Sequence, residues 1–327
     1  MPLDLPPLPT ALPAWTVRRP TAADVDAVLA LAEAVDRATL GYSDWSREDV
    51  EADLTSSSAP ARLNQLLVLD GDRPLAWALV EDRAAGRVSS NLAVDRELPG
   101  EQADLLAGWA LRWLVGRAGD LARERDRPDT LVDAGLVDGD EAQEGWLRAG
   151  GFTPARTYWR MSRAVDGVPD PDPVAGVTVR SVVPGRADLE VVHAVVEEAF
   201  ADHWNHHPRE FAQWWRAQRE SAGHDLDLWW LAELDGAPVG ALLATTQMFG
   251  EGALFVATLG VRRCARGRGV ARSLLRRAFG EARRRGLERV SLTVDGASPT
   301  GATALYRSEG MDVDFAMRVL QRPVTGG

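Results

Sequence analysis

Residues 257–271 read ATLGVRRCARGRGVA, and this stretch decides how the second half of the chain is interpreted. Its apolar start predicts the end of a β-strand, after which Gly267 and Gly269 stand in a turn rich in arginine. The run from Gly269 to Arg285 predicts a long amphipathic helix. The apolar stripe of that helix consists of Val270, Leu274, Leu275 and Ala278. The stretch is therefore predicted to be a strand, a basic glycine turn and a helix, in that order.

The basic turn is suited to a diphosphate. The first turn of a helix exposes backbone N–H groups and a partial positive charge, and glycine lets that backbone approach an anion closely. Arginine side chains that add positive charge are Arg263, Arg266, Arg268 and Arg272. Two other interpretations stay open for the turn alone: a basic turn that binds nothing, and an arginine–glycine patch for RNA. The spacing differs from the dinucleotide fingerprint G-x-G-x-x-G, and a P-loop requires a lysine, which this sequence lacks.

Outward from the turn, strand and helix patterns alternate through the second half of the chain. Strands are expected at 177–183, 227–233, 238–247, 253–261, 289–294 and 312–320, and helices at 187–204, 208–221, 269–285 and 299–308. The preceding segment 164–176 contains three prolines that alternate with acidic residues and is interpreted as a linker.

The first half of the chain repeats the same order of elements. Strands are expected at 15–19, 65–69, 75–81 and 88–95, and helices at 22–37, 100–116 and 140–150. The turn at Asp70-Gly71 matches Asp235-Gly236, and Gly151-Phe152 matches Gly310-Met311. A repeat this long predicts an α/β protein made of two copies of one fold.

Composition restricts the classes of partner. A net charge of −11 argues against nucleic acid, whose phosphates need a basic surface. The sequence has no apolar run of the ~20 residues that a membrane-spanning helix requires. Cys264 is the single cysteine, which excludes an internal disulfide and a metal cluster built on thiolates. Residues 1–14 lack a basic start and an apolar centre, so we expect an N-terminal tail on a cytoplasmic protein.

Two motifs resemble those of a known family. Arg266, Gly269 and Ala271 fill the fixed places of Arg/Gln-x-x-Gly-x-Gly/Ala, which follows a strand and opens a helix in the GNAT superfamily of N-acetyltransferases. Residues 297–311 resemble the second landmark of that family, N-x-x-A-x-x-L-Y-x-x-x-G-F. The places that agree are Leu305, Tyr306 and Gly310; those that differ are Ser298 for Asn and Met311 for Phe. The resemblance covers residues 177–321.

The resemblance implies an α/β fold with a mixed sheet and a role for each motif. It implies two tandem GNAT folds: a tail (1–14), a degenerate GNAT-like domain (15–163), the linker (164–176) and a catalytic domain (177–321). Acetyl-CoA would be bound by Leu259, Gly260, Val261, Arg266, Gly267, Arg268, Gly269, Val270, Ala271, Arg272 and Ser298. Tyr306 would protonate the departing thiolate, for which a phenol with an ordinary pKa near 10 is a competent acid. No metal is expected.

The general base cannot be assigned from the sequence. Candidates are Glu251, Asp202 and His203, since the GNAT fold places their segments around the acceptor, although a surface role is as compatible with each of them. The neighbouring segment 203–215 is rich in histidine and tryptophan. It has no carboxylate or thiolate at a spacing that completes a metal site, and its aromatic residues are interpreted either as helix packing or as walls of an acceptor pocket.

The first half lacks the residues that the resemblance requires. Its equivalent loop carries Glu97 and Glu101 where arginines stand in the second half, and Pro99 where an N–H donor is needed. Two carboxylates repel a diphosphate, and Leu147 occupies the position that corresponds to Tyr306. We therefore expect a copy that keeps the fold and has lost the chemistry. In architecture the chain resembles tandem GNAT proteins such as mycothiol synthase.

The expected function is transfer of an acetyl group from acetyl-CoA to the amine of a small molecule, by direct attack on the thioester. A non-catalytic acyl-CoA-binding sensor or scaffold and a protein-lysine acetyltransferase are the alternatives. We expect no nucleic-acid or membrane partner, and a monomer or homodimer. The sequence does not identify the acceptor or the preferred acyl chain.

Overall fold

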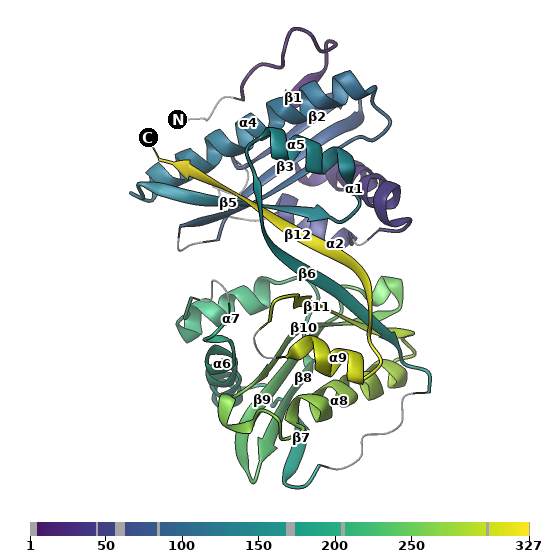
Figure 1. The fold of residues 1–327 in the computed structure, drawn as a ribbon, viewed down its shortest axis with the longest axis vertical. Coiled ribbons are helices and arrows are strands. Elements are labelled where there is room, and N and C mark those ends of the chain that lie inside the picture. The colour runs from purple at the N-terminus through teal and green to yellow at the C-terminus, as the bar shows by residue number, and fades with distance from the viewer. Residues whose placement is uncertain are drawn as a thin grey trace. The chain divides into compact units, whose positions relative to one another are not determined.

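The computed structural model describes residues 5–43, 45–55, 63–83, 86–167, 174–203, 207–298 and 301–326. The chain divides into two compact units (Figure 1). The N-terminal unit comprises residues 1–158 and 315–327, and the C-terminal unit comprises residues 159–314. The boundaries between the units fall inside two long strands, β6 (Thr153–Ala164) and β12 (Asp312–Thr325).

The C-terminal unit follows the element order expected from the sequence. Its elements are β7 (Val177–Ser181), α6 (Arg186–Phe200), α7 (Phe211–Glu220), β8 (His224–Leu234), β9 (Ala237–Thr245), β10 (Ala253–Val261), α8 (Val270–Arg284), β11 (Arg289–Asp295) and α9 (Ala302–Ser308). Strands β7 to β10 pair in antiparallel order, and β10 pairs with β11 in parallel. The fold is therefore the mixed α/β sheet that was expected.

Helices cover both faces of this sheet. The predicted stripe of α8 is fully buried, with Val270 at 1% and Leu274 at 0% exposure. A Cβ on Gly240 of β9 would lie 2.8 Å from Val270, whereas a Cβ on Gly260 of β10 would lie 2.9 Å from the Cβ of Ala199 in α6. Gly240 pairs with Val261, the neighbour of Gly260. Because successive residues of a strand face opposite ways, α8 and α6 lie on opposite faces.

The N-terminal unit repeats this plan, with elements that the sequence interpretation missed. Its elements are β1 (Thr16–Arg18), α1 (Val25–Leu40), α2 (Arg47–Thr55), β2 (Gln65–Asp70), β3 (Arg73–Asp82), β4 (Arg87–Val94), α4 (Gly100–Glu124), β5 (Asp129–Val137), α5 (Glu141–Ala149) and the start of β6. Helix α2 and strands β5 and β6 were not anticipated. Strand β5 alternates in burial as a half-buried strand does.

Strand β12 completes the sheet of the N-terminal unit. It pairs with β5 in antiparallel register from Met317–Val137 to Thr325–Asp129. This pairing places residues 315–327 with the N-terminal unit, whereas the sequence interpretation assigned residues up to 321 to the second domain. The expected end of the first domain at residue 163 differs in the same way, because β6 enters the C-terminal unit at Trp159.

The described part of the expected N-terminal tail is packed against α4. The indole N–H of Trp109 donates to the carbonyl of Pro7 across 3.0 Å. Leu12 is 7% exposed, and Leu5 and Leu8 contact the same apolar core. Residues 5–14 are therefore part of the N-terminal unit.

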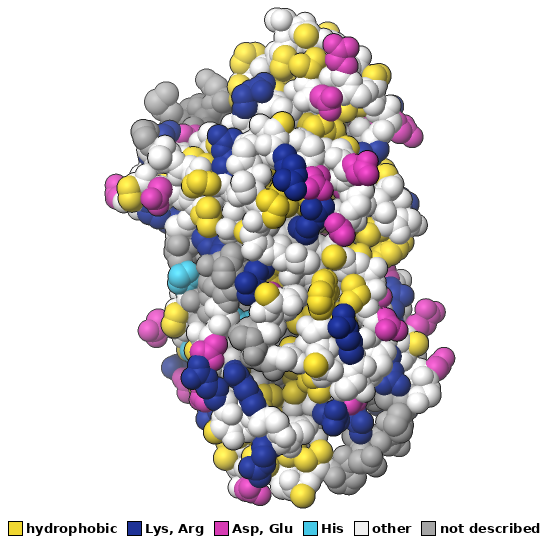
Figure 2. Space-filling model, in the orientation of Figure 1, with side chains coloured by type: hydrophobic (Ala, Val, Ile, Leu, Met, Phe, Trp, Pro, Cys, Tyr) yellow, Lys and Arg dark blue, Asp and Glu magenta, His cyan; other side chains and the backbone are white. Residues whose placement is uncertain are grey.

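The surface mixes both signs of charge. On the face shown in Figure 2, arginine side chains lie beside acidic ones. Several described arginines are ion-paired, among them Arg87 with Asp133 and Arg276 with Glu309. None of the helices that the structure describes is both long enough and apolar enough to cross a membrane.

Candidate active site

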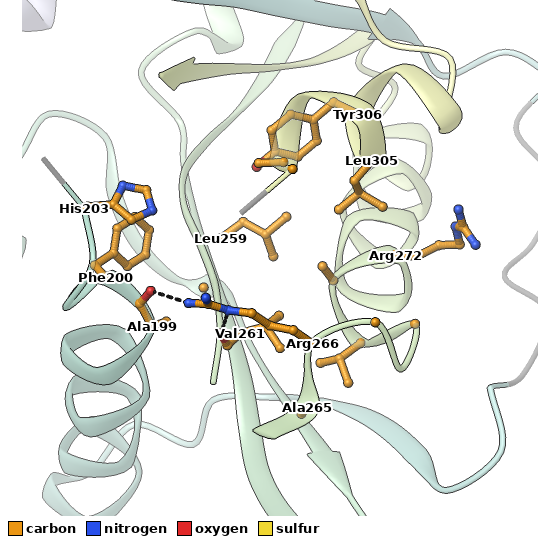
Figure 3. Close-up of a pocket in the computed structure, with 17 residues that line it drawn as sticks. Ala199, Phe200, His203, Leu259, Val261, Ala265, Arg266, Arg272, Leu305 and Tyr306 are labelled. Atoms are coloured by element: carbon orange, nitrogen blue, oxygen red, sulfur yellow. Dashed lines mark hydrogen bonds between the residues drawn. The ribbon is translucent and has the colours of Figure 1, made fainter. Parts of the chain in front are cut away.

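A cavity of about 310 Å³ opens at the end of β10, between α6, the start of α8 and α9 (Figure 3). Its seventeen lining residues are Ala199, Phe200, His203, Leu259, Gly260, Val261, Ala265, Arg266, Gly267, Gly269, Val270, Ala271, Arg272, Gly301, Ala302, Leu305 and Tyr306. The structure thus brings together Tyr306 and all but two of the residues that were predicted to bind the cofactor. The exceptions are Arg268 and Ser298.

The cavity lies beyond the point where β10 stops pairing with β11. The parallel pairing of these strands runs from Ala253–Arg289 to Val256–Leu292. The register between β10 and β9 then shifts by one residue between Val256 and Thr258. Such a bulge bends a strand and re-aims its side chains and backbone. Beyond it, β10 still pairs with β9, so the backbone groups of its other edge become available to a ligand.

The glycines of the basic turn adopt a backbone conformation that other residues rarely adopt. Gly267 has φ +74° and Gly269 has φ +79°. Gly269 is the N-cap of α8 and provides no side-chain cap, so the first N–H groups of the helix keep their donor capacity. Together with the helix dipole, this arrangement is an anion site. The Cβ of any other residue at Gly269 would also lie 3.1 Å from Val174.

Arg266 points back toward the protein backbone, although it was predicted to contact phosphate. Its Nε donates to the carbonyl of Val261 across 3.2 Å, and its Nη2 donates to the carbonyl of Ala199 across 3.0 Å. These bonds connect the turn to the ends of β10 and α6, as the dashed lines in Figure 3 show. Arg266 therefore positions the walls of the cavity.

Of the other arginines of the region, some are held by carboxylates of the protein and one is exposed to solvent. Arg263 forms a two-pronged ion pair with Asp202. Arg272 donates to Glu309 across 2.6 Å, and in Figure 3 its side chain points away from the cavity. Arg268 is exposed and makes no ion pair with any residue in the described ranges. Arg268 is therefore the arginine of the turn whose charge is left for a ligand.

Glu309 anchors α9 to α8. Its carboxylate, 4% exposed, accepts from Arg272 and from Arg276, the latter across 2.8 Å. This pairing could not be predicted from a sequence pattern, because Glu309 lies more than thirty residues from both arginines. The bridge fixes the helix that carries Tyr306.

Tyr306 lies at the wall of the cavity and is 7% exposed (Figure 3). Burial raises the pKa of its phenol to about 12, since the charged phenolate loses its hydration. Its hydroxyl makes no hydrogen bond to any residue that the structure describes. The phenol is therefore protonated at neutral pH and able to donate, but with a pKa of about 12 it is a weaker acid than the ordinary phenol expected from the sequence.

The structure distinguishes among the three candidate bases. His203 lines the cavity. Asp202 is held by Arg263, and Glu251 lies in a short 3-10 turn (Phe249–Glu251) that does not contribute to the cavity wall. Two of the residues predicted to bind the cofactor make contacts within the protein. Gly260 packs against α6, and Ser298 donates its backbone N–H to the carbonyl of Asp295.

Trp214, in the segment predicted to be rich in aromatic residues, packs between helices and sheet. Trp214 of α7 is fully buried, and its ring lies 6.0 Å from that of Trp229 and 5.2 Å from that of His193. Trp204, Asn205 and His206 of the same segment lie outside the described residues. Within the described ranges, no group of three His, Cys, Asp or Glu side chains is arranged to hold a metal ion.

The corresponding region of the N-terminal unit differs in two ways. Strand β4 pairs with β3 without a shift, from Ala76–Val94 to Asp82–Val88, so the bulge of β10 has no counterpart. Arg96, in the loop after β4, donates to Asp140 and to Gln143 of α5. The N-terminal unit therefore has an unshifted β4 and a loop that is tied to α5 by Arg96. Both features agree with the expectation of a degenerate copy.

Comparisons with known proteins place the chain in a family. Residues 189–311 match the acetyltransferase (GNAT) family. A mycothiol acetyltransferase of Thermobispora bispora is 33% identical over 297 residues, which cover 89% of this chain and 94% of the relative. A GCN5-related N-acetyltransferase of Sphaerobacter thermophilus has a similar structure, with a TM-score of 0.80, 29% identity and coverage of 96% and 98%.

The two-unit architecture also has a solved counterpart. A tandem GNAT protein from the clavulanic acid biosynthesis pathway shares the fold, with a TM-score of 0.69 at 15% identity, and the match covers 96% of this chain and 99% of that one. The extent of these matches and the motifs at Arg266 and Tyr306 lead to one conclusion. The chain belongs to the GNAT family of acetyltransferases.

Proposed function

We propose that the C-terminal unit transfers an acetyl group from acetyl-CoA to the amine of a small molecule. The observation that carries this proposal is one cavity lined both by backbone of an anion site, at Gly267, Gly269, Val270 and Ala271, and by a buried phenol, Tyr306. Its volume of about 310 Å³ falls at the lower end of the range typical of ligand pockets.

The residues of the cavity fit an acyl-CoA diphosphate. The N–H groups at the start of α8, together with the backbone at Gly267 and Gly269, would hold its oxygens. Arg268 would add positive charge to the site, because Arg263 and Arg266 are engaged by groups of the protein itself. The apolar side chains of Leu259, Val261 and Leu305 would accommodate the uncharged arm that follows the diphosphate.

The reaction needs a polarised carbonyl and a proton for the leaving sulfur. Bound acetyl-CoA supplies an activated thioester. Backbone N–H groups of β10 beyond the bulge would stabilise negative charge that develops on the carbonyl oxygen, as donors of this kind do in acyl transfer. Tyr306, protonated because burial raises its pKa to about 12, would donate its proton to the sulfur.

The acceptor is open within the class of small amines. The relative from Thermobispora bispora is named for mycothiol, and the high coverage of both chains makes the deacetylated form of mycothiol the first amine to test. Other small primary amines form the rest of the panel, because acceptor contacts vary within a family more readily than the fold does.

The test is acetyl-CoA turnover with this panel, followed by the release of the CoA thiol and by mass spectrometry of the acetylated amine. We expect thiol release that depends on one or more amines. Tight CoA binding with no turnover on any amine would support a sensor or scaffold instead. Acetylated lysines in added protein, with no small amine modified, would support a protein acetyltransferase.

A further inference from the structure

We propose that His203 accepts the proton that the acceptor ammonium must lose before its nitrogen attacks the thioester. This inference rests on the proposed function. It assigns to the same cavity the general base, which neither the sequence nor the family comparison identifies.

Few side chains of the cavity wall are ionisable. Among its seventeen described residues these are His203, Arg266, Arg272 and Tyr306. Arginine stays protonated in proteins, and the pKa of Tyr306, about 12, keeps its phenol protonated at neutral pH. Histidine is the side-chain type that ordinarily changes its charge between pH 5 and 8. His203 is thus the lining residue that is able to accept a proton at neutral pH.

The position of His203 is defined by its neighbours. Its ring packs on that of Phe200, with centroids 4.4 Å apart, and its backbone N–H donates to the carbonyl of Phe200 across 2.8 Å. Figure 3 shows Leu259 of β10 between the rings of His203 and Tyr306. The two rings therefore flank the strand along which the acyl arm is expected to lie.

The charged group next to His203 in the chain is the carboxylate of Asp202. Asp202 precedes it, and that carboxylate is engaged by Arg263, with Arg266 3.8 Å away. Strand β10 contributes no ionisable side chain. Across the cavity lies Tyr306, which stays neutral. Besides its arginine partners, the carboxylate of Asp202 interacts electrostatically with His203, and a nearby negative charge favours the protonated imidazole.

The acceptor nitrogen loses two protons in the reaction, and each of them has a destination. The ammonium of the acceptor carries three protons and the amide product keeps one. One proton passes to His203 and from there to solvent. The amine nitrogen then forms a bond to the carbonyl carbon, the carbon–sulfur bond breaks, and Tyr306 protonates the sulfur. The remaining proton of the nitrogen restores the Tyr306 hydroxyl.

The test compares His203→Gln with His207→Gln, measured as kcat/KM for the amine across a pH series. His207 is an exposed histidine four residues along the chain and does not line the cavity, so it is a matched control. We expect His203→Gln to lower kcat/KM by about 10²-fold or more at neutral pH. The loss narrows at high pH, where the free amine is already deprotonated, and the Kd for acetyl-CoA stays unchanged.

A second variant, His203→Ala, distinguishes the loss of a base from a change in structure. Imidazole added to His203→Ala is expected to restore part of the rate without changing the Kd for acetyl-CoA, since a packing defect would not be repaired by a soluble base. An unchanged rate in His203→Gln, or a loss equal at every pH without rescue by imidazole, overturns the assignment. Wild-type protein that turns over no amine at all would instead overturn the proposed function.

Discussion

The guanidinium of Arg266 donates to the carbonyl of Ala199 across 3.0 Å, and this hydrogen bond joins the turn before α8 to the last residues of α6. A second bond, to the carbonyl of Val261, ties the same side chain to the end of β10. One arginine therefore positions the walls on which a ligand and His203 are placed. Its role is to organise the backbone around the cavity.

Arg266→Ala removes both bonds and leaves two carbonyl acceptors without this donor. We expect a loss of about 1–2 kcal/mol in the free energy of unfolding, together with weaker binding of acetyl-CoA. Arg268→Ala is the control, because Arg268 is exposed and unpaired within the described ranges: stability should change by less than about 0.5 kcal/mol while the affinity falls. Chemical denaturation and calorimetry measure the two quantities. The reverse pattern would contradict this division of roles.

Gly267→Ala and Gly269→Ala test the backbone of the turn. Both positions have positive φ, and a left-handed conformation costs a residue with a Cβ about 1–2 kcal/mol. The loss should be larger at Gly269, where the Cβ also meets Val174. Gly280→Ala, inside α8 and without neighbours within 4 Å of its Cβ, should stabilise by about 0.5–1 kcal/mol. Equal stability changes at all three positions would refute the backbone argument.

The sequence predicted the local features of the C-terminal unit well, because each of these features is determined by residues that are close together in the chain. The glycines of the turn and the apolar stripe of α8 lie within one helix and its N-terminus. They suffice to predict a strand, a turn and a helix, and the matched family confirms the GNAT fold. The bulge at Val256–Thr258 was not predicted, since it depends on how β10 pairs with β9.

What the sequence could not predict depends on distant partners. Strand β12 pairs with β5 across more than 170 residues, so its membership of the N-terminal unit has no local signal. The predicted phosphate contact of Arg272 illustrates the same limit. A helical arginine beside an anion site is expected to face it, but the carboxylate of Glu309 on α9 draws the side chain away.

Tyr306→Phe tests the predicted acid. We expect kcat to fall by about 10²-fold, and by the same factor at about pH 8 and about pH 10, because the wild-type hydroxyl stays protonated over this range. The Kd for acetyl-CoA should change by no more than about twofold. Stopped-flow or steady-state rates measure the first quantity, and calorimetry the second. Retention of full turnover at every pH would remove Tyr306 from the mechanism.

The raised pKa of Tyr306 also leads to a prediction for how the free energy of unfolding depends on pH. Its folded pKa of about 12 exceeds the ordinary value of 10.0, so the folded state holds its proton more strongly than the unfolded state. The contribution is complete below about pH 10 and is lost as pH rises through about 12. Denaturation of wild type and Tyr306→Phe at increasing pH should show the steeper decline in the wild type. Parallel declines would contradict the burial of the phenol.

Glu309→Gln and Glu281→Gln form a matched pair. Each carboxylate is 4% exposed and accepts from two arginines, but Glu309 bridges to α9 and Glu281 stays within α8 and its end. Both changes should cost about 1–3 kcal/mol of stability, because hydrogen bonds to a charged acceptor are weakened. Only Glu309→Gln should lower kcat, because α9 carries Tyr306. Equal effects on kcat would show that the bridge does not position the phenol.

The ion pairs of Glu281 also make the free energy of unfolding depend on pH. Its arginine partners lower its pKa to about 2, from the ordinary 4.5. Since the folded pKa lies below the unfolded one, its stabilising effect is present above about pH 4.5 and is lost as pH falls toward 2. The difference in unfolding free energy between wild type and Glu281→Gln should therefore shrink on acidification. A constant difference would contradict the ion pair.

The most direct test of the account is the calorimetric titration of the whole chain with acetyl-CoA. The anion site at Gly267 to Ala271 and the absence of a bulge in β4 predict one binding site per chain, located in the C-terminal unit. A stoichiometry of one supports the account. No detectable binding, or two equivalent sites per chain, would contradict it.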